Sequence, residues 1–574
     1  MNAELLLAHY DRISDAPDAV ARLRKFILDL AVRGKLLKQD SKEEPAADLL
    51  KRIQKEKTQL VKDGELKKFD LAPLPLNKDF PFPLPPRWAA SDLQSLCISV
   101  TDGDHLPPPK QGHGIPLLVI GNIRDHSLSF EGCRHVSLQY YNALDSIRKP
   151  RKRDILYSLV GSYGIPVLIN DDRQFCVQRH IGILRPSRSV NAIFLARVLK
   201  SKWVLDQATT FATGIAQKTV ALSGLRKILI PLPPFAEQHR IVAKLDHLMG
   251  VCDRLEAAQN ERETRRDQLT ASAHHHLRNG EDSEELSNHA RFFIGHLPRL
   301  TKRPDQIKQL RQTILNLAVR GKLVPQTDAD EPVMDLLQRI QTEQKDLIRR
   351  RVIKGREYGT ASPADEAFIE IPQTWQFVFL GKILTFGPQN GISPTASSRP
   401  EAPRSITLTA TTSGTFKSEH FKQIEANIPA DSEFWIRQGD LLFQRGNTRE
   451  YVGMAAYYDG EPGQFLYPDL IIKVRPTKSV DLRYIHLCST APYARAYFGR
   501  NASGAQSTMP KINHDILVNL PIPLPPFAEQ HRIVAMVDEL MALCDKLEAR
   551  LSTAQTETSR LLESVLHHAL EASA

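Results

Sequence analysis

The chain has 574 residues, 25% charged and 41% hydrophobic, which predicts several folded domains of ordinary globular composition. No apolar run reaches the roughly 18 residues of a membrane-spanning helix, and six cysteines without CxxC spacing argue against a disulfide framework and a zinc site. The formal net charge of +10 favours a polyanionic partner.

The N-terminal residues and the cysteines predict a cytoplasmic protein. Residues 1–15 hold a short apolar run followed by acids, which is not the pattern of a secretory signal. Free cysteines without paired spacing fit a reducing compartment.

The first predicted elements are a helix and a stiff linker. Apolar residues recur every three or four positions from Leu23, and Gly34 follows them as a helix C-cap. Residues 71–87, LAPLPLNKDFPFPLPPR, hold too many prolines for a regular helix or a central strand. We therefore assign residues 1–87 to an N-terminal helical arm and a proline-rich linker.

Residues 88–230 predict a mixed α/β domain with a basic surface. Short β-type runs alternate with glycine turns, and Lys and Arg outnumber Asp and Glu by 18 to 10. Five cations within residues 148–153 indicate an anionic neighbour such as DNA phosphate, with a solvated loop as the alternative. The candidate DNA-binding residues of this segment are Arg148, Lys149, Arg151, Lys152, Arg153, Ser158, Ser162 and Tyr163.

A long helix is predicted after Pro233 and Pro234, where proline is well tolerated. It continues for about 40 residues, or about 60 Å at 1.5 Å per residue. Its apolar stripe is narrow, which favours a coiled-coil seam, and packing on the helix's own domain is the alternative. The predicted seam is Ile241, Leu245, Leu248, Cys252 and Leu255 here, and Ile533, Val537, Leu540, Cys544 and Leu547 in a second helix further on.

The whole arrangement occurs twice. LAVRGKL occupies residues 30–36 and 317–323, and PLPPFAEQHRIVA occupies residues 231–243 and 523–535. A 13-residue identity of this kind does not arise by chance, so the chain is a tandem repeat. We call the recurring segments on either side of the variable ones the frame.

The segments enclosed by the frame differ from each other. Residues 89–230 and 376–522 are similar in length but share little sequence apart from RDILYS in the first and GDLLFQ in the second. Cations exceed anions only by 15 to 12 in residues 375–522, where a solvated surface is the alternative. One scaffold with two unlike DNA-binding domains fits this pattern. Arg and amide side chains can pair with base edges, so the candidates here are Arg437, Gln444, Arg445, Asn447 and Arg449.

No catalytic motif is recognisable. Amino-methyltransferases need Asn or Asp before Pro-Pro-Phe to accept a hydrogen bond from the target amine, and this chain has Leu232 and Leu524 there. A phosphate-binding GxxxxGK[ST] loop and a complete metal-nuclease motif are absent from the sequence, and the run from His274 to His276 is expected to be a solvated helix end. We predict no catalytic residue, no metal and no cofactor.

The frame resembles that of the specificity subunit of type I restriction–modification systems. The resemblance rests on the two PLPPFAEQHRIV segments, each followed by a long helix, on the two LAVRGKL segments and on the RDILYS and GDLLFQRG strands, and it covers essentially the whole chain. It implies two α/β target recognition domains, each of which reads one half of an asymmetric bipartite DNA site. It also implies two long antiparallel coiled-coil helices that set the gap between the half-sites.

The resemblance further implies the partners. The frame would dock two methyltransferase subunits, and restriction subunits with translocase and nuclease domains would join them on double-stranded DNA. The methyl donor, ATP and magnesium would belong to those partners. The predicted fold is thus a mixed α/β, pseudo-two-fold tandem repeat. Its parts are the arm and linker (1–87), target recognition domain 1 (88–230), a central helical spacer and arm (231–374), target recognition domain 2 (375–522) and a C-terminal spacer helix (523–574).

Two other functions stay open from the sequence. The chain could be an enzyme whose catalytic part is cryptic, which methyl transfer by the purified chain would reveal. It could be a protein-binding adaptor, which a gel shift on random duplex DNA with the methyltransferase partner would test. For the favoured function, shortening the 241–270 helix by one or two turns should change only the gap. Neutralising Arg148–Arg153 should weaken binding to all sequences alike.

Overall fold

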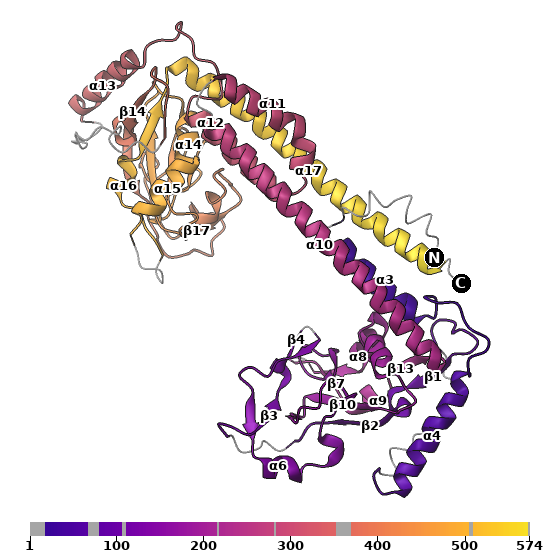
Figure 1. Cartoon of the computed structure of the whole chain (residues 1–574). Helices are drawn as coiled ribbons and strands as arrows, with labels where there is room; N and C mark the ends of the chain where they lie inside the picture. Colours follow the sequence, from indigo (N-terminus) through magenta and orange to yellow (C-terminus); the bar gives the residue numbers. More distant parts are fainter. Residues whose placement is uncertain are drawn as a thin grey trace. The chain divides into compact units, whose positions relative to one another are not determined.

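The computed structural model describes residues 16, 18–66, 80–105, 111–124, 126–214, 217–279, 283–351, 369–503 and 509–571. The chain divides into two compact units (Figure 1). The first comprises Met1–Arg262 and Ala554–Ala574, and the second comprises Glu263–Thr553. Residues 1–15 and the part of the predicted linker before residue 80 lie outside the described residues. No helix in the described ranges is long and apolar enough to cross a bilayer.

The frame of the first unit begins with the helix predicted from Leu23. This helix, α3 (Ala19–Val32), buries Phe26 and Leu30. Directly after it Gly34 has φ +68°, and a Cβ there would lie 2.3 Å from Cγ of Pro85. Glycine is therefore required both by the backbone and by the close approach of the linker. The other frame helices of this unit are α4 (Ala46–Lys62) and parts of α10 (Phe235–Asn279) and α17 (Phe527–Glu571).

The second unit repeats this frame closely. Gly321 has φ +67°, and a Cβ there would lie 2.4 Å from Cγ of Pro372. The same local geometry thus recurs 287 positions later, as the sequence repeat predicts. The helices of this part are α11 (Ser283–Leu300), α12 (Pro304–Val319) and α13 (Val333–Arg349), with the other parts of α10 and α17.

Within the first unit, the elements from β1 (Ala89–Asp92) to β13 (Leu229–Leu232) form an α/β domain, which we call the first domain. An antiparallel sheet runs in the order β2 (Cys97–Asp102), β10 (Ile181–Pro186), β7 (Ile155–Ser158) and β8 (Pro166–Leu168). A strand pair, β1 with β13, closes the domain where it joins the frame. The remaining elements are α5 (Leu93–Leu96), β3 (Ile115–Leu118), η2 (Ile120–Asn122), β4 (Ile123–Arg124), β5 (Ser127–Leu128), β6 (Arg134–Val136), α6 (Leu138–Ala143), η3 (Ser146–Arg148), β9 (Cys176–Val177), α7 (Ala192–Leu199), α8 (Lys202–Phe211), β11 (Ala212–Thr213), β12 (Thr219–Val220) and α9 (Leu222–Arg226).

The elements from β14 (Gln376–Phe379) to β21 (Pro521–Leu524) form the second domain, within the second unit. Its sheet has the matching order: β15 (Leu384–Asn390), β20 (Ile471–Pro476), β18 (Leu441–Gln444) and β19 (Ala455–Tyr457). The closing pair is β14 with β21. The two domains thus share one sheet topology although they share little sequence. The remaining elements are η5 (Leu380–Ile383), β16 (Arg404–Ile406), η6 (Leu408–Ala410), β17 (Phe421–Gln423), α14 (Leu482–Thr490), α15 (Pro492–Asn501) and α16 (His514–Val518).

The central strand of each sheet is buried on both faces. In β7, Ile155 and Tyr157 belong to the core that includes the frame helices, whereas Leu156 belongs to a separate core under the β3–β9 region. All four residues of β18 are likewise buried. The strands β7 and β18 therefore have no solvent-exposed face.

The apolar stripes of the long helices pack on their own domains. Ile241, Leu245 and Cys252 of α10 belong to the core formed by α3, α4 and the first domain, and that cluster holds no residue of α17. Ile533, Val537 and Cys544 of α17 have the equivalent place in the second unit, in a cluster without α10. These residues thus lie in the core of their own unit, and the predicted seam between the two long helices stays a prediction. Leu248, Leu255, Leu540 and Leu547 lie partly buried against the same clusters.

The long helices are nonetheless antiparallel within the first unit, because the shorter helix α3 contacts both. In the first unit Arg24 of α3 pairs with Asp253 of α10 at 2.6 Å, and Arg22 donates to the carbonyl of Ser559 in α17 at 3.1 Å. Glu43, which follows α3 in the chain, binds Arg240, which lies nearer the start of α10 than Asp253 does. The helices α3 and α10 therefore point in opposite directions. Phe26 and Leu30 pack on Leu566, which follows Ser559 in α17, so α3 and α17 point in the same direction.

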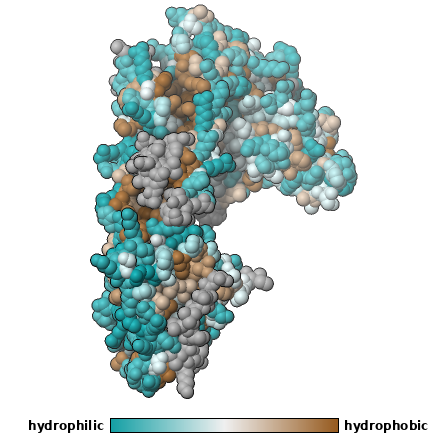
Figure 2. Space-filling model, turned by 90° about the vertical axis from the view of Figure 1, so that its right-hand side faces the viewer, coloured by the Kyte–Doolittle hydropathy of each residue, from teal (hydrophilic) through white to brown (hydrophobic). Residues whose placement is uncertain are grey.

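One face of the molecule is predominantly polar. On the face drawn in Figure 2, hydrophilic residues predominate and hydrophobic residues form separate patches. This distribution agrees with a chain in which a quarter of the residues are charged.

Candidate nucleic-acid interface

The repeated AEQHR sequence holds each long helix to its α/β domain. Gln238 is fully buried, and its amide group donates to the carbonyl of Pro233 at 3.0 Å while accepting from the backbone N–H of Asn191 at 2.9 Å. Asn191 in turn caps α7, where its side chain accepts from two backbone N–H groups. Gln530, Pro525 and Asp481 repeat these contacts in the second unit, followed by α14.

A buried carboxylate fastens the linker to the same helix. The indole N–H of Trp88 donates to Glu237 at 3.1 Å, and that of Trp375 donates to Glu529 at 3.0 Å. Burial raises the pKa of Glu529 to about 7 and that of Glu237 above its usual value. The identity of the two PLPPFAEQHR segments is thus explained by contacts inside the frame.

A buried ion pair fixes the segment that precedes β7. Asp154 and Arg185 are 2% and 6% exposed, and their closest oxygen and nitrogen atoms are 2.9 Å apart. The same guanidinium donates to the carbonyl of Lys149 at 2.9 Å. A paired charge at this depth holds the basic segment against the strand, and removing one partner would leave the other uncompensated.

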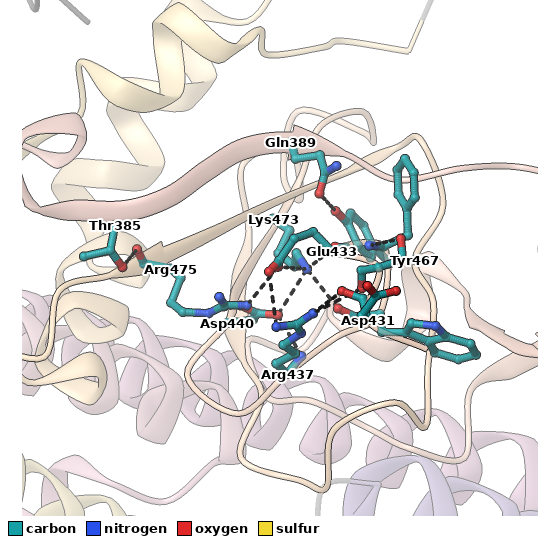
Figure 3. A network of polar contacts seen from close by, with 12 residues as sticks. Thr385, Gln389, Asp431, Glu433, Arg437, Asp440, Tyr467, Lys473 and Arg475 are labelled. Carbon is teal, nitrogen blue, oxygen red and sulfur yellow. Dashed lines mark hydrogen bonds and ion pairs between the residues drawn. The ribbon is translucent and has the colours of Figure 1, made fainter. Parts of the chain in front are cut away.

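The second domain keeps this ion pair and adds a buried lysine (Figure 3). Arg475 pairs with Asp440 at 2.6 Å, and Lys473 lies 3.4 Å from the same carboxylate. The ammonium also donates to the carbonyls of Glu433 and Trp435, the latter at 2.9 Å. Lys473 is fully buried, so these contacts fix the segment before β18 as Arg185 does in the first domain.

The basic segment is only partly available to DNA. Arg148 donates to the carbonyl of Gly103 at 2.6 Å, and Lys149 donates to the carbonyl of Asn142 at 2.9 Å. These two cations are used inside the domain. Arg151, Lys152 and Arg153 are exposed.

The three exposed cations border a cavity of about 530 Å³ beside α4. Arg188 and the acids Glu56 and Glu65 also line it. Burial, with Arg185 and Arg188 nearby, lowers the pKa of Arg151. Acidic frame residues therefore share this cavity with the basic segment.

Two predicted DNA contacts are wrong, because their side chains are buried. Ser158 is 0% exposed, and its hydroxyl donates to the carbonyl of Ser162 at 2.8 Å and accepts from the N–H of Ile165. Gln444 is also 0% exposed, and its amide donates to the carbonyl of Leu408 at 2.9 Å. Both side chains thus form hydrogen bonds inside their own domain.

The remaining candidates stay at or near the surface of the turns. Ser162 is exposed, and Tyr163 is half-buried with its hydroxyl 3.1 Å from that of Thr209. Arg449 is exposed and Arg445 is half-buried.

Two further candidates are engaged inside the second domain. Asn447 donates to the side-chain oxygen of Gln444 at 2.6 Å. Arg437 is bound to the carbonyl of Asp431 at 2.6 Å and to Glu433 at 3.2 Å.

Sequence reasoning missed the anchoring residues and misplaced one histidine. Asp154 and Asp440 occupy the same place in RDILYS and GDLLFQ, which is the signal that could have indicated a shared role. His274 is 3% exposed and lies 3.1 Å from the hydroxyl of Thr313, so it is a core residue and not a solvated helix end. Among the described residues no group of three or more His, Cys, Asp or Glu could hold a metal ion.

Comparison with known proteins assigns the family. The model of the type I restriction modification DNA specificity domain matches residues 110–263 and again residues 372–554, which together are more than half of the chain. The two matches begin within the two α/β domains or directly before them and extend into α10 and α17. The chain therefore belongs to the type I restriction modification DNA specificity family.

Individual relatives cover nearly the whole chain. The type I restriction enzyme EcoEI specificity subunit of Escherichia coli is 29% identical over 96% of this chain and 94% of its own. The EcoAI specificity subunit of the same species is 27% identical with the same coverage. Among solved structures, the HsdS subunit from Thermoanaerobacter tengcongensis is 18% identical over 86% of this chain and 99% of its own, with a TM-score of 0.41.

Proposed function

We propose that this chain is the DNA sequence-specificity subunit of a type I restriction–modification complex. The first domain reads one half of an asymmetric bipartite site on double-stranded DNA, and the second domain reads the other half. The observation that carries the proposal is the pairing of identical frame contacts with two domains of one topology and different side chains. Two different half-sites require two domains with different side chains, and a common position for both domains requires the same frame contacts twice.

The long helices set the gap between the half-sites. Each of α10 and α17 begins in one unit and ends in the other, so its length enters the separation of the two domains. The duplicated frame presents matching surfaces twice, which suits two copies of one partner, the methyltransferase subunit. Restriction subunits join this core in the cytoplasm. The methyl donor, ATP and magnesium are bound by these partner subunits and not by this chain.

The DNA contacts come from candidate side chains that lie at or near the surface of the domains. The exposed cations Arg151, Lys152 and Arg153 suit backbone phosphates, which position a protein on DNA without reading its sequence. The turns after β7 and β18 carry polar candidates for base edges, namely Ser162, Tyr163, Arg445, Asn447 and Arg449.

Methylation sequencing tests the proposal directly. The chain is expressed with its methyltransferase partner in a host without other modification systems, and methylated bases are mapped. We expect one asymmetric bipartite motif that disappears when the chain is omitted. Methyl transfer by the purified chain alone would contradict a non-catalytic subunit, and methylation that does not depend on the chain would contradict its role in specificity.

A further inference from the structure

We infer that each domain reads base edges with one particular end of its four-stranded sheet, the end where the chain leaves β7 or β18. The opposite end is the attachment to the frame. This inference rests on the proposed function and specifies which surface carries it. We call the two base-reading ends the free ends, because frame helices α4 and α13 dock at the other ends.

In the first domain the free end is built from segments that are distant in sequence. The N–H of Leu159, directly after β7, donates to the carbonyl of His180 at 3.0 Å. The N–H of Gly161 donates to the carbonyl of Lys218 at 3.0 Å. The turn that the sequence singled out is therefore one part of a composite surface.

The second domain has the same construction. The N–H of Arg445, directly after β18, donates to the carbonyl of Leu470 at 2.7 Å, and its carbonyl accepts from the N–H of Ile512 at 2.8 Å. The N–H of Asn447 donates to the carbonyl of Pro510 at 3.3 Å. Matching main-chain bonds thus join the corresponding segments in both domains.

A further segment reaches this end through a close backbone approach. A Cβ on Gly103, directly after β2, would lie 1.9 Å from the carbonyl oxygen of Val177. A Cβ on Gly391, directly after β15, would lie 2.0 Å from that of Tyr467. Only glycine fits such contacts, so both domains bring the residue directly after their first sheet strand to the free end.

The side chains at the free ends differ between the domains although the backbone agrees. In the first domain Arg179, Gln217 and Lys218 are exposed. In the second domain Arg449 and Lys511 are exposed. The cations of both sets can donate to base edges, and Gln217 of the first set can both donate and accept. A shared backbone with different side chains is expected where two domains read two sequences.

The opposite end of the first domain is occupied by the frame. Glu56 of α4 accepts a hydrogen bond from Ser187, which directly follows β10. Lys57 is 1% exposed and donates to the carbonyl of Gln94, just before β2, at 2.7 Å. These contacts place α4 at the strand ends that lie away from the turn after β7.

The second domain is attached at the corresponding end. Glu343 of α13 accepts from Thr477, directly after β20. Gln344 donates to the carbonyl of Leu384, the first residue of β15, at 3.1 Å. In both units, therefore, a frame helix docks at the same end of the sheet, beside which Arg151, Lys152 and Arg153 of the first domain stay exposed.

Charge also separates the two ends. The attached end is basic in the first domain, where residues 148–153 hold five cations, but the corresponding residues 434–439 of the second domain hold one cation, Arg437, and follow Asp431 and Glu433. The segments of the free end carry exposed cations in both domains. A contact surface that both domains use against a polyanion must be cationic in both, which favours the free end.

Paired variants of the first domain distinguish the ends. The complex of the full chain with its methyltransferase partner is bound to duplexes that carry the mapped site with the first half randomised. We expect R179Q/K218Q to lower affinity for the cognate half-site about tenfold and to change the preferred bases there, with the second half-site unaffected. The matched K152Q/R153Q variant removes the same charge at the attached end, and it should weaken binding to all sequences alike.

The second domain supplies an independent test with R449Q/K511Q and the control D431N. The first should alter preference only in the second half-site, and the control should leave preference unchanged. Changed base preference in K152Q/R153Q or D431N, with preference intact in the free-end variants, would overturn the inference. If the unaltered complex shows no sequence preference, the proposed function fails instead. Equal melting temperatures confirm that the variants fold.

Discussion

Two equivalent glutamates in the frame have different surroundings. Glu237 uses both carboxylate oxygens, because Trp88 donates to one at 3.1 Å and Gln39 donates to the other at 2.6 Å. Glu529 accepts from Trp375 through one oxygen, and its other oxygen is buried without a hydrogen-bond partner among the described residues. A buried carboxylate with fewer donors is less stable when ionised, which is why burial raises the pKa of Glu529 to about 7.

This raised pKa makes the stability of the second unit depend on pH. Between the ordinary pKa of 4.5 and about 7, the folded state keeps the Glu529 proton and the unfolded state does not. The free energy of unfolding therefore falls as pH rises through that window, by at most about 3 kcal/mol, and is level above it. We expect Glu529→Gln to remove this fall and to raise the melting temperature at pH 8, as measured by calorimetry at pH 5 and pH 8.

Glu237→Gln is the matched control for that measurement. Its second oxygen already has a donor in Gln39, so the gain in melting temperature at pH 8 should be smaller. Equal gains from the two variants would contradict the role assigned to the orphan oxygen of Glu529.

Among the elements, the long helices α10 and α17 connect the units. Asn260 of α10 and Ser552 of α17 are equivalent in the repeat and lie within two residues of the boundary between the units. Inserting four residues after each adds about 6 Å and turns each helix by about 40°. One base pair turns DNA by about 34°.

We therefore expect this double insertion to lengthen the gap by one or two base pairs and to leave both half-site sequences unchanged. Methylation sequencing measures both quantities. Replacing residues 257–260 and 549–552 by alanines keeps the helix length and should keep the gap. An unchanged gap after insertion would show that helix length does not set it.

Elements with local signals could be predicted from the sequence. The spacing from Leu23 located α3, and the prolines before Phe235 located the start of α10. The sheet order could not be predicted, because strand pairing joins residues as distant as Asp102 and Gly182. The sequence repeat identified the frame segments but not the contacts within them. Trp88 and Glu237, for example, are 149 positions apart in the sequence, and no local pattern pairs them.

The candidate site was only partly predictable for a related reason. Gln444 is a candidate because amide side chains can pair with base edges, and Ser158 has the corresponding place in RDILYS. Both central strands are covered on their two faces, so these side chains point into protein. Arg148 looked like a free cation because nothing in the sequence shows that the carbonyl of Gly103 lies 2.6 Å away.

At the scale of the whole molecule, the chain is one frame built twice around two domains. The domains join the frame through equivalent strand pairs, β1 with β13 and β14 with β21. The linker tryptophan and the glutamate that binds it lie outside those joins in both units. An entire domain can therefore be exchanged at residues 89–230 and 376–522 without removing that frame contact.

The most direct test of the account is a chain in which residues 376–522 replace residues 89–230, so that the frame holds two copies of the second domain. The chain is expressed with its methyltransferase partner, and methylated sites are mapped by sequencing. If each domain reads one half-site on a pseudo-symmetric frame, the site becomes a palindrome made of the second half-site and its inverted copy. Retention of the original asymmetric site would contradict the assignment of one half-site to each domain.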